Sequence, residues 1–491
     1  MRTVERIQDK ALIGDEWVSA VGGGTIEVRN PSTDALIASV PNGGAADVAK
    51  AIDAASAALP AWRALPGIER SKKLRKLYDL MIRDQDRLAA LMTLELGKPF
   101  AEARGEVVYA AGFIEWSAEE AKRIYGETVQ AFVPDKRLIV LRQAIGVTAS
   151  ITPWNFPAAM IARKMGPALA AGCTMIAKPA SKTPLTALAM GELVLEAGIP
   201  AGVFNVIPGS AKEMAQALLS DGRVRALSFT GSTEVGKELM VMAAQHVTKL
   251  GLELGGHAPF LVFDDANIDL AVAGALGSKY RNAGQTCICA NRIYVQSGIH
   301  DRFVAALAEK SASLKVGDGF EDGVNIGPLV DDRAVVKVEE HVADAVANGA
   351  TIAVGGHRLS LGEGHADRFY APTVLSGVKR GMKIMEEETF GPVAPVIRFD
   401  TEAEALRMAN DTPYGLAAYL YTRDASRLIR VAEALEYGIV GANDGLPSTP
   451  QVPFGGWKES GLGREGGKWG LEEYLETKIV SWGIEPAPAE G

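Results

Sequence analysis

Residues 146–178 read GVTASITPWNFPAAMIARKMGPALAAGCTMIAK. Two short apolar runs, GVTASI at 146–151 and CTMIAK at 173–178, flank a longer segment with helical spacing. Short apolar runs bounded by turn residues predict buried strands, and the segment from Ala158 to Ala171 is long enough for a helix. A strand, a helix and a second strand in this order predict parallel strands joined by a right-handed crossover.

The same alternation continues toward the C-terminus. Further strands are predicted at 202–207 and 224–230, and further helices at 211–219 and 233–245. Between the strands predicted at 173–178 and 202–207, Thr183 and Pro184 are typical of the N-cap and first position of a helix, which Gly198 and Pro200 would end. Regular alternation predicts an α/β fold with helices on both faces of a parallel sheet.

A second alternating set runs from about Pro259 to Asn443 and predicts a second α/β domain. Within it, the segment 331–348 has the spacing of an amphipathic helix. The valines expected to face inward are Val335, Val338, Val342 and Val346. Two strand-like segments, 126–141 and 471–483, lie outside both sets. We expect their edges to pair with each other or with another subunit.

Composition limits the classes of function. The chain has 491 residues, 47% of them hydrophobic and 23% charged, which is typical of a globular protein of two or three domains. Its net charge of −9 argues against nucleic acid or an anionic membrane as the main partner. No apolar run reaches the roughly 18 residues of a membrane span. Three cysteines fit free thiols in a reducing compartment, so we expect a cytoplasmic protein.

Two glycine motifs suggest nucleotide binding, and both are incomplete. Residues 461–466, GLGREG, match G-x-G-x-x-G but follow no strand and leave too few residues for a βαβ unit, so a turn is the better interpretation. Residues 231–238, GSTEVGKE, resemble a phosphate loop, but Glu238 replaces the hydroxyl that binds Mg²⁺. The second motif therefore predicts a helix start suited to a phosphate or pyrophosphate, without nucleotide triphosphatase activity.

Cys287 is the candidate nucleophile. It lies in the polar segment NAGQTC at 282–287, where a helix start would lower the pKa of its thiol. A buried core cysteine is the alternative, and Cys173, at the start of an apolar strand, fits that description. No histidine lies at a zinc-like spacing from Cys287, so we expect no metal site.

Two more side chains fit acyl chemistry. Glu253 lies between leucines in LELGG at 252–256, where burial would raise the pKa of its carboxyl and suit it to act as a base. Asn155 lies on the loop after a strand, at the edge of the sheet where ligands bind, and its amide suits an oxyanion. A solvated Glu at a strand end and a turn-forming Asn are the plain alternatives.

Taken together, these segments resemble the aldehyde dehydrogenase superfamily. The motifs occur in the family's order and with similar spacing: TPWNFP, GCTMIAKPAS, FTGSTEVG, LELGG, NAGQTC and EETFGP. The resemblance implies a Rossmann-like cofactor domain at 1–125 and 142–255, and an α/β catalytic domain at 256–445. It also implies that residues 126–141 and 446–491 form a small β oligomerisation arm and a substrate anchor loop, and that the protein is a homodimer or homotetramer.

The resemblance further assigns roles. Cys287 would form a thioester with the substrate, Asn155 and the Cys287 N–H would hold the oxyanion, and Glu253 would activate the hydrolytic water. The positions that match the family's cofactor contacts are Thr152, Pro153, Trp154, Lys178, Ser181, Gly231, Ser232, Leu254, Glu388 and Phe390. A cysteine esterase with the same catalytic residues is the alternative class, but it would not need the cofactor positions.

Ser181 bears on the choice of cofactor. Many NAD-preferring members of the family carry glutamate there, which would repel a 2′-phosphate. A serine near Lys178 would instead accept that phosphate. The resemblance therefore implies that NADP is preferred and that NAD is also used.

Three residues bear on the substrate. Arg163, Arg281 and Ser448 match carboxylate-binding positions of the succinate-semialdehyde dehydrogenases, which the chain most resembles. Two arginines near an aldehyde pocket suit a distal carboxylate. His257 and Asp444 depart from the pattern of that subfamily, so glutarate semialdehyde and 2-oxoglutarate semialdehyde stay open as alternatives.

Overall fold

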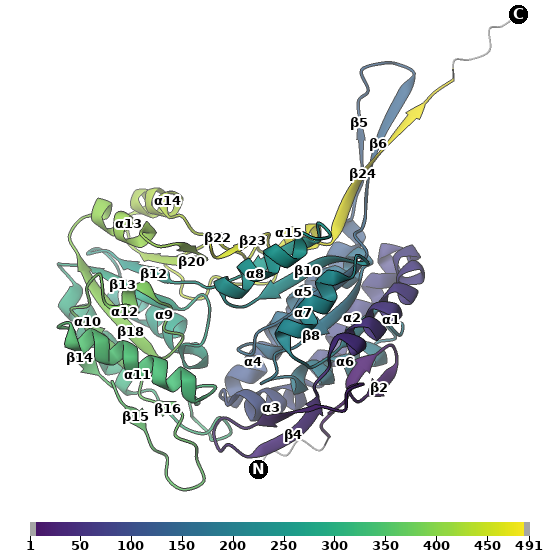
Figure 1. The fold of residues 1–491 in the computed structure, drawn as a ribbon. Helices are drawn as coiled ribbons and strands as arrows, with labels where there is room; N and C mark the ends of the chain where they lie inside the picture. Colours follow the sequence, from purple (N-terminus) through teal and green to yellow (C-terminus); the bar gives the residue numbers. More distant parts are fainter. Residues whose placement is uncertain (1–5, 486–491) are drawn as a thin grey trace, which may run out of the picture.

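The first alternating set forms an eight-stranded sheet in the computed structural model, which describes residues 6–485 (Figure 1). The strand order is β2-β1-β9-β8-β7-β10-β11-β23, and the run from β9 to β11 is parallel, as the alternation predicts. The strands are β1 Ala11–Ile13, β2 Glu16–Val18, β7 Val147–Ile151, β8 Thr174–Lys178, β9 Phe204–Val206, β10 Val224–Thr230, β11 Lys249–Glu253 and β23 Gly461–Leu462.

Helices cover both faces of this sheet, and each face has a separate apolar core beneath its helices. The helices of one face are α1 Ala45–Ala64, α7 Ala211–Ser220 and α8 Thr233–Ala243. Those of the other face are α2 Gly67–Arg83, α3 Gln85–Leu96, α4 Phe100–Glu120, α5 Pro157–Ala171 and α6 Leu185–Glu196. The predicted two-sided cover is therefore confirmed, and α4 packs along α5 in the second layer.

The start of α6 corrects one expectation. The predicted N-cap, Thr183, donates its hydroxyl to the Trp154 carbonyl at 3.3 Å instead of capping the helix. The free N–H groups of Leu185 and Thr186 donate to the buried Glu95 carboxylate of α3, at 2.7 and 3.0 Å. A side chain from a neighbouring helix thus satisfies the N-terminus, a solution that no local pattern reveals.

The second set forms a seven-stranded sheet in the order β14-β17-β18-β13-β12-β20-β21. Its strands are β12 Ala258–Val262, β13 Ala290–Gln296, β14 Thr351–Val354, β17 Thr373–Ser376, β18 Val393–Phe399, β20 Ala417–Tyr421 and β21 Ile439–Ala442. The predicted amphipathic helix is α11, Asp332–Ala347. It buries Val335, Val338 and Val342, but Val346 is 43% exposed and Ala345 takes the inward position, because the buried face also includes His341, which moves its centre away from Val346.

Shorter elements complete both halves. The remaining helices are α9 Ile268–Tyr280, α10 His300–Ala312, α12 Lys383–Glu386, α13 Glu402–Asn410, α14 Ala425–Ala434 and α15 Gly467–Glu472, with 3-10 turns η1 Ala121–Arg123 and η2 Arg281–Gly284. The remaining strands outside the arm are β3 Thr25–Arg29, β4 Leu36–Pro41, β15 Arg358–Leu359, β16 Phe369–Tyr370, β19 Tyr414–Gly415 and β22 Trp457–Lys458.

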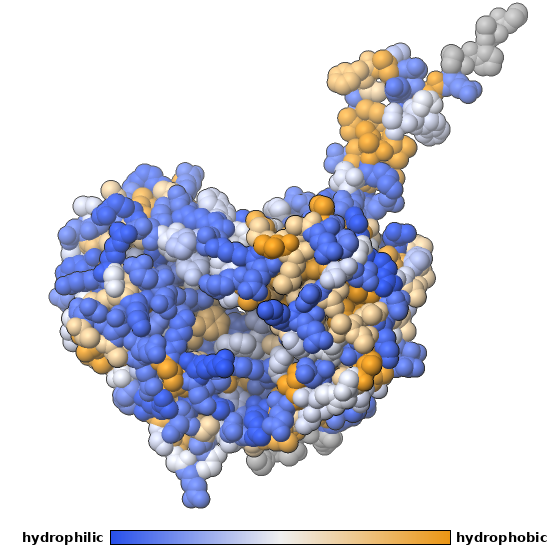
Figure 2. All heavy atoms as spheres, viewed as in Figure 1, coloured by the Kyte–Doolittle hydropathy of each residue, from blue (hydrophilic) through white to orange (hydrophobic). Residues whose placement is uncertain are grey.

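A three-stranded arm projects from the body (Figure 1). It consists of β5 Glu127–Val129, β6 Lys136–Ala144 and β24 Leu475–Gly483, and β24 pairs with β6 along its whole length. The two predicted strand-like segments therefore pair with each other. Figure 2 shows apolar side chains gathered on this arm, and Phe132, Ile479 and Trp482 are 106%, 64% and 64% exposed.

The predicted domain boundary at 255–256 lies between β11 and β12, which belong to different sheets. The assignment of a separate role to each segment stays a prediction, and residues 1–5 and 486–491 lie outside the described part. Among residues 6–485, no helix is both long and apolar enough to cross a membrane.

Candidate active site

The predicted motifs meet between the two sheets. TPWNFP, KPAS, FTGS and LELGG follow the carboxyl ends of β7, β8, β10 and β11, which is the edge where open α/β sheets bind ligands. NAGQTC precedes β13 of the second sheet, and EETFGP precedes β18. The rings of Trp154 and Phe390 meet edge to face across this junction, with centroids 5.6 Å apart. The fold therefore brings together motifs that are distant in the sequence.

Cys287 lies on an irregular loop. The residues before it, Asn282 and Ala283, have positive φ angles of 51° and 57°, so no α-helix starts here. Burial raises the pKa of the Cys287 thiol to about 12, and the nearby charges of Glu388 and Glu253 act in the same direction. The predicted lowering of this pKa by a helix start is therefore wrong, because the loop supplies no helix dipole. The thiol needs a base to take its proton.

The segment LELGG crosses from β11 to β12 and presses against the Cys287 loop. A Cβ atom on Gly256 would lie 2.3 Å from the carbonyl oxygen of Cys287. Only glycine fits this approach, because any side chain would push the two segments apart. The segment that contains Glu253 is thus fixed against the loop that contains Cys287.

Asn155 is buried beside the same loop, at 3% exposure. Its Nδ2 donates to the carbonyl of Gln285, two residues before Cys287, at 3.0 Å. An amide nitrogen has two N–H groups, and within residues 6–485 the bond to Gln285 is the only hydrogen bond of this nitrogen, so its second N–H is free. The amide oxygen Oδ1 is also buried without a partner in this range. A free donor on a buried, fixed amide suits a developing oxyanion.

Glu253 belongs to a group of charged side chains, the Glu465 cluster: Arg163, Lys164, Glu253 and Glu465. Arg163 Nε lies 3.3 Å from Glu465 Oε2, and Lys164 Nζ bonds the other carboxylate oxygen. Burial raises the pKa of Glu253 well above its usual value, and the Glu465 charge raises it further against the two cations.

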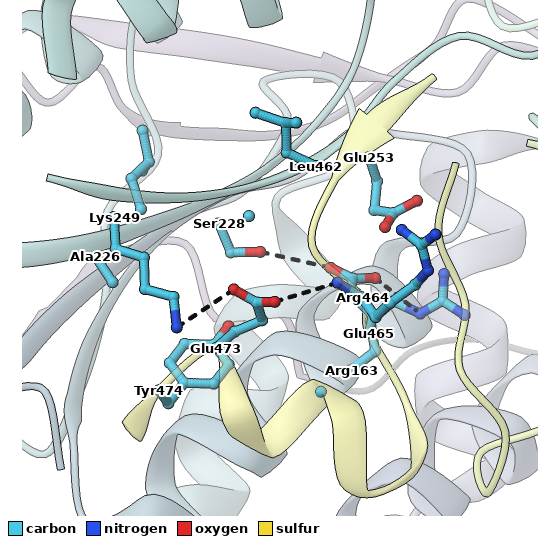
Figure 3. A pocket seen from close by; sticks show the side chains of 13 residues that line it. Arg163, Ala226, Ser228, Lys249, Glu253, Leu462, Arg464, Glu465, Glu473 and Tyr474 are labelled. Atoms are coloured by element: carbon cyan, nitrogen blue, oxygen red, sulfur yellow. Dashed lines mark hydrogen bonds and ion pairs between the residues drawn. The ribbon is translucent and has the colours of Figure 1, made fainter. Parts of the chain in front are cut away.

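Figure 3 shows the Glu253 carboxylate beside the side chain of Arg464, on the same side of the pocket as Glu465 and Arg163. Glu253 is 3% exposed, and its Oε2 has no hydrogen-bond partner among the described residues. A buried carboxylate with a high pKa and a free oxygen suits a proton acceptor. The burial and the pKa direction expected for Glu253 are therefore present.

A small cavity joins the nucleophile to all three predicted substrate residues. Its lining consists of Tyr109, Phe156, Ala159, Met160, Arg163, Arg281, Thr286, Cys287, Ile288, Ser448 and Phe454. His257 and Asp444 do not line it. His257 is buried against the Met385 carbonyl, and exposed Asp444 accepts the Leu446 N–H, so neither contacts a substrate in this cavity.

The two cavity arginines have different surroundings. Arg163 is 2% exposed, bonds Tyr109 Oη at 2.9 Å and lies 4.1 Å from the Phe454 ring centroid. Arg281 lies 4.8 Å from the Phe156 ring centroid and has neither hydrogen bond nor ion pair within residues 6–485. The Arg281 guanidinium therefore has all its donors available for an anion in the cavity.

The predicted cofactor positions line the junction between the sheets. Lys178 is buried without a hydrogen-bond partner in the described chain, and burial lowers its pKa to about 8. Glu388 Oε1 is also buried and unpartnered, and burial raises the pKa of Glu388 to about 8. Two buried polar groups without partners fit a bound group that carries hydroxyls.

The other cofactor positions, apart from Phe390, lie beyond the carboxyl ends of β7, β8, β10 and β11 in the first sheet. Ser232 caps α8 by accepting the Val235 N–H at 3.4 Å, beside Gly231. Ser181 donates to the Gly209 carbonyl at 3.2 Å, and the Thr152 N–H donates to the Lys178 carbonyl. Pro153 is half-buried and Leu254 is buried. Phe390 has a φ of 54°, a conformation that costs a non-glycine residue energy and is common at functional sites.

Sequence reasoning missed residues on α4. Tyr109 bonds both Arg163 and Ser448, the latter at 2.6 Å. Glu106 and Lys98 form a buried ion pair beside Asn155. The available signal was the spacing of Glu102, Glu106 and Tyr109, which places polar groups on one face of an otherwise apolar helix. In residues 6–485, no group of three or more His, Cys, Asp or Glu side chains is arranged to hold a metal.

Comparisons with known proteins identify the family of this chain. The model of the aldehyde dehydrogenase family matches residues 17–480. A glutarate-semialdehyde dehydrogenase of Pseudomonas aeruginosa is 57% identical over 98% of this chain and 99% of its own length. An NADP-dependent succinate-semialdehyde dehydrogenase of Escherichia coli is 58% identical over 97% of this chain and 98% of its own. The solved structure of an E. coli NADP-dependent enzyme superposes with a TM-score of 0.96 at 57% identity, covering 99% of this chain and all of that one.

Proposed function

Because the chain belongs to the aldehyde dehydrogenase family, we propose that it oxidises succinate semialdehyde to succinate with NADP⁺. One observation carries the proposal: the cavity that contains Cys287 also contains Arg281, whose guanidinium has no hydrogen-bond or ion-pair partner among the described residues. A planar guanidinium binds a carboxylate through two parallel hydrogen bonds. A short aldehyde with a carboxylate at its far end therefore satisfies both the nucleophile and the arginine.

The chemistry uses three side chains of this protein. The Cys287 thiol releases its proton to solvent, Cys287 Sγ bonds to the aldehyde carbon, and the oxyanion accepts hydrogen bonds from the free Asn155 N–H and the Cys287 main-chain N–H. A bound NADP⁺ would supply the hydride acceptor for this carbon, which would leave a thioester on Cys287. Glu253 then takes a proton from water, the water oxygen bonds to the thioester carbon, and the C–S bond breaks to give succinate. The departing Cys287 thiolate takes the proton back from Glu253, which restores both side chains.

The cofactor positions support NADP as the preferred cofactor. Lys178 and Glu388 offer unpartnered buried groups to the ribose side of the cofactor, and α8 offers its N-terminus to the pyrophosphate. Ser181 adds no negative charge where a 2′-phosphate would lie. NAD⁺ is accepted as well, because none of these residues requires the phosphate.

Glutarate semialdehyde is the alternative substrate. It carries the same two functional groups with one more methylene, and a curated relative of nearly equal similarity is named for it. One methylene changes binding in an apolar pocket by only about 1–3 kcal/mol, so both compounds fit the proposed chemistry. 2-Oxoglutarate semialdehyde is the third member of this set.

The proposal includes a homodimer or homotetramer in the cytoplasm. The arm exposes large apolar side chains, which favours burial against a second copy. All three cysteines are free thiols, as a reducing compartment would keep them. Sedimentation velocity tests the assembly, and a monomeric species at micromolar concentration would contradict it.

The test measures initial rates of NADPH and NADH formation with succinate, glutarate and 2-oxoglutarate semialdehydes, beside uncharged butanal. We expect kcat/KM for the best semialdehyde to exceed that for butanal by about 10²-fold, since loss of a charged contact costs several kcal/mol. Cys287→Ser controls for the nucleophile. Equal rates with butanal would refute the proposed substrate class, and the ranking of the semialdehydes selects among the three.

A further inference from the structure

One face of α4 contacts three separate parts of the active site. Glu102, Glu106 and Tyr109 follow each other at helical spacings of four and three residues, so they share that face. Glu102 Oε2 accepts the main-chain N–H of Asn282 in the Cys287 loop at 3.0 Å. Tyr109 bonds Arg163 and Ser448 in the cavity wall. Glu106, between them, reaches the segment that carries Asn155.

Glu106 satisfies the start of α5. Its Oε1 accepts the N–H groups of Ala158 and Ala159 at 3.0 and 3.2 Å, and no side chain of the segment itself caps this helix. The first N–H groups of a helix carry partial positive charge, so a carboxylate there is stabilising. The beginning of α5, directly after Asn155, is thereby fixed to α4.

Lys98 completes the arrangement. Its ammonium pairs with Glu106 Oε2, and both side chains are 1% exposed. The same ammonium donates to the carbonyl oxygen of Asn155 at 3.0 Å and lies 4.2 Å from the Phe156 ring centroid. This carbonyl accepts a second hydrogen bond from Asn282 Nδ2, also at 3.0 Å. The main chain of Asn155 is therefore held by one charged donor and one neutral donor.

The side chain of Asn155 depends on that main chain. Its Nδ2 has one N–H on Gln285 and the other free, so a small shift of the backbone would move the free N–H relative to Cys287. Misplacement by about 1 Å of a group that stabilises a transition state reduces rates by about 10²-fold. We infer that the Lys98–Glu106 pair is a positioning pair that aims the Asn155 amide at the oxyanion, an inference that rests on the proposed thioester mechanism.

A double-mutant cycle tests the inference with the full-length protein. Lys98→Met, Asn155→Ala and the double variant are assayed for NADPH formation with the preferred semialdehyde. We expect Asn155→Ala to lower kcat by about 10²–10³-fold, as loss of an oxyanion donor does elsewhere. We expect Lys98→Met to lower kcat by about 10–100-fold with KM changed less than about threefold, and to have no further effect in the Asn155→Ala background.

A second variant covers the case that Lys98→Met fails to fold with an unpaired Glu106. Lys98→Met combined with Glu106→Gln removes both charges and keeps a carbonyl for the α5 N–H groups. The same cycle against Asn155→Ala then applies. Alkylation of Cys287 by iodoacetamide needs no oxyanion donor, so we expect its rate to stay within about threefold of that of the unaltered protein.

Glu95→Gln serves as the matched control. Glu95 is also a buried carboxylate that caps a helix, but it contacts α6 and has no bond to Asn155. We expect any effect of Glu95→Gln on kcat to be the same in both backgrounds. A tenfold loss caused by Lys98→Met or the neutral pair in the Asn155→Ala background would overturn the inference. An unchanged kcat in Asn155→Ala alone would instead refute the proposed oxyanion role.

Discussion

Arg163 and Arg281 line the same cavity, and their surroundings differ in every respect that matters for binding. Arg163 is buried on α5, paired with Glu465, bonded to Tyr109 and stacked on Phe454. Arg281 stands at the start of the Cys287 loop with one aromatic contact and no polar partner within residues 6–485. The family resemblance implies the same role for both residues, as carboxylate-binding arginines.

The difference indicates that the two arginines have separate tasks, Arg163 within the Glu465 cluster and Arg281 toward the substrate. The Arg163 charge is largely compensated by Glu465, so its main effect is on the Glu465 cluster and on the pKa of Glu253. Among the described residues the Arg281 charge has no counter-ion in hydrogen-bond contact, although it opposes the rise in the pKa of the buried Glu102 carboxyl. Its N–H donors are therefore available to the carboxylate of a substrate. Four substitutions and their controls test this division, in order of decreasing expected effect.

Arg163→Met is expected to reduce stability most. The change leaves Glu465 with Lys164 as its only cation in direct contact, and breaking one side of a buried ion pair costs about 3–5 kcal/mol. Urea unfolding followed by fluorescence measures the loss. Arg281→Met is the matched control, with an expected change below about 0.5 kcal/mol. Equal stability of the two variants would remove the distinction.

Arg281→Met is expected to reduce selectivity most. We expect kcat/KM for succinate semialdehyde to fall by about 10²-fold and kcat/KM for butanal to change less than about threefold, because only the first compound carries a carboxylate. Steady-state rates with both aldehydes measure the ratio, and Arg281→Lys should recover part of it. A parallel loss with butanal would show that Arg281 supports the loop instead of the substrate.

Glu465→Gln is expected to shift the pH dependence. Glu253 accepts protons only when ionised, so a raised pKa means that activity is lost as pH falls through that pKa. Removing the Glu465 charge lowers the pKa of Glu253, so the acid limb of kcat, which includes hydrolysis of the thioester, should move to lower pH.

Glu473→Gln provides the control for this shift. Glu473 lines the pocket of Figure 3 together with Glu465. Its carboxylate pairs with Lys249, 3.6 Å away, and it is not among the charges that raise the pKa of Glu253. Its acid limb should stay within about 0.2 pH units of the original. An acid limb that stays in place or rises in Glu465→Gln would contradict the influence of the Glu465 cluster on Glu253.

Ser448→Ala is expected to have the smallest effect. It removes a neutral hydroxyl that bonds Tyr109 and lines the cavity, and such a hydrogen bond contributes about 0.5–1.5 kcal/mol. KM for succinate semialdehyde should rise about threefold to tenfold, with kcat nearly unchanged. Thr449→Ala, at the exposed neighbouring position, should leave KM as it is. A larger effect than that of Arg281→Met would reverse the order of the two contacts.

The alternation of strands and helices and the positions of the motif loops can be predicted from the amino-acid sequence alone. The apolar runs at 146–151 and 173–178 are local patterns. They predict buried strands because a short run of apolar side chains is stable only when it is removed from water. The order of strands and helices then puts TPWNFP, FTGS and LELGG at one edge of the sheet. The gathering of Cys287, Arg281 and Ser448 in one cavity follows from the family resemblance and the fold.

The electrostatics of the site depend on how the folded chain packs. The pKa of Cys287 rises because the folded chain buries it, whereas the local pattern suggested a helix start that would lower it. Lys164 and Glu465 meet across 301 residues of sequence, and Glu106 reaches α5 from a different helix. Such contacts depend on which surfaces pack together, so no window of sequence contains them. Short sequence motifs therefore contain the residues that carry out the chemistry, and burial in the folded protein sets their charge states and partners.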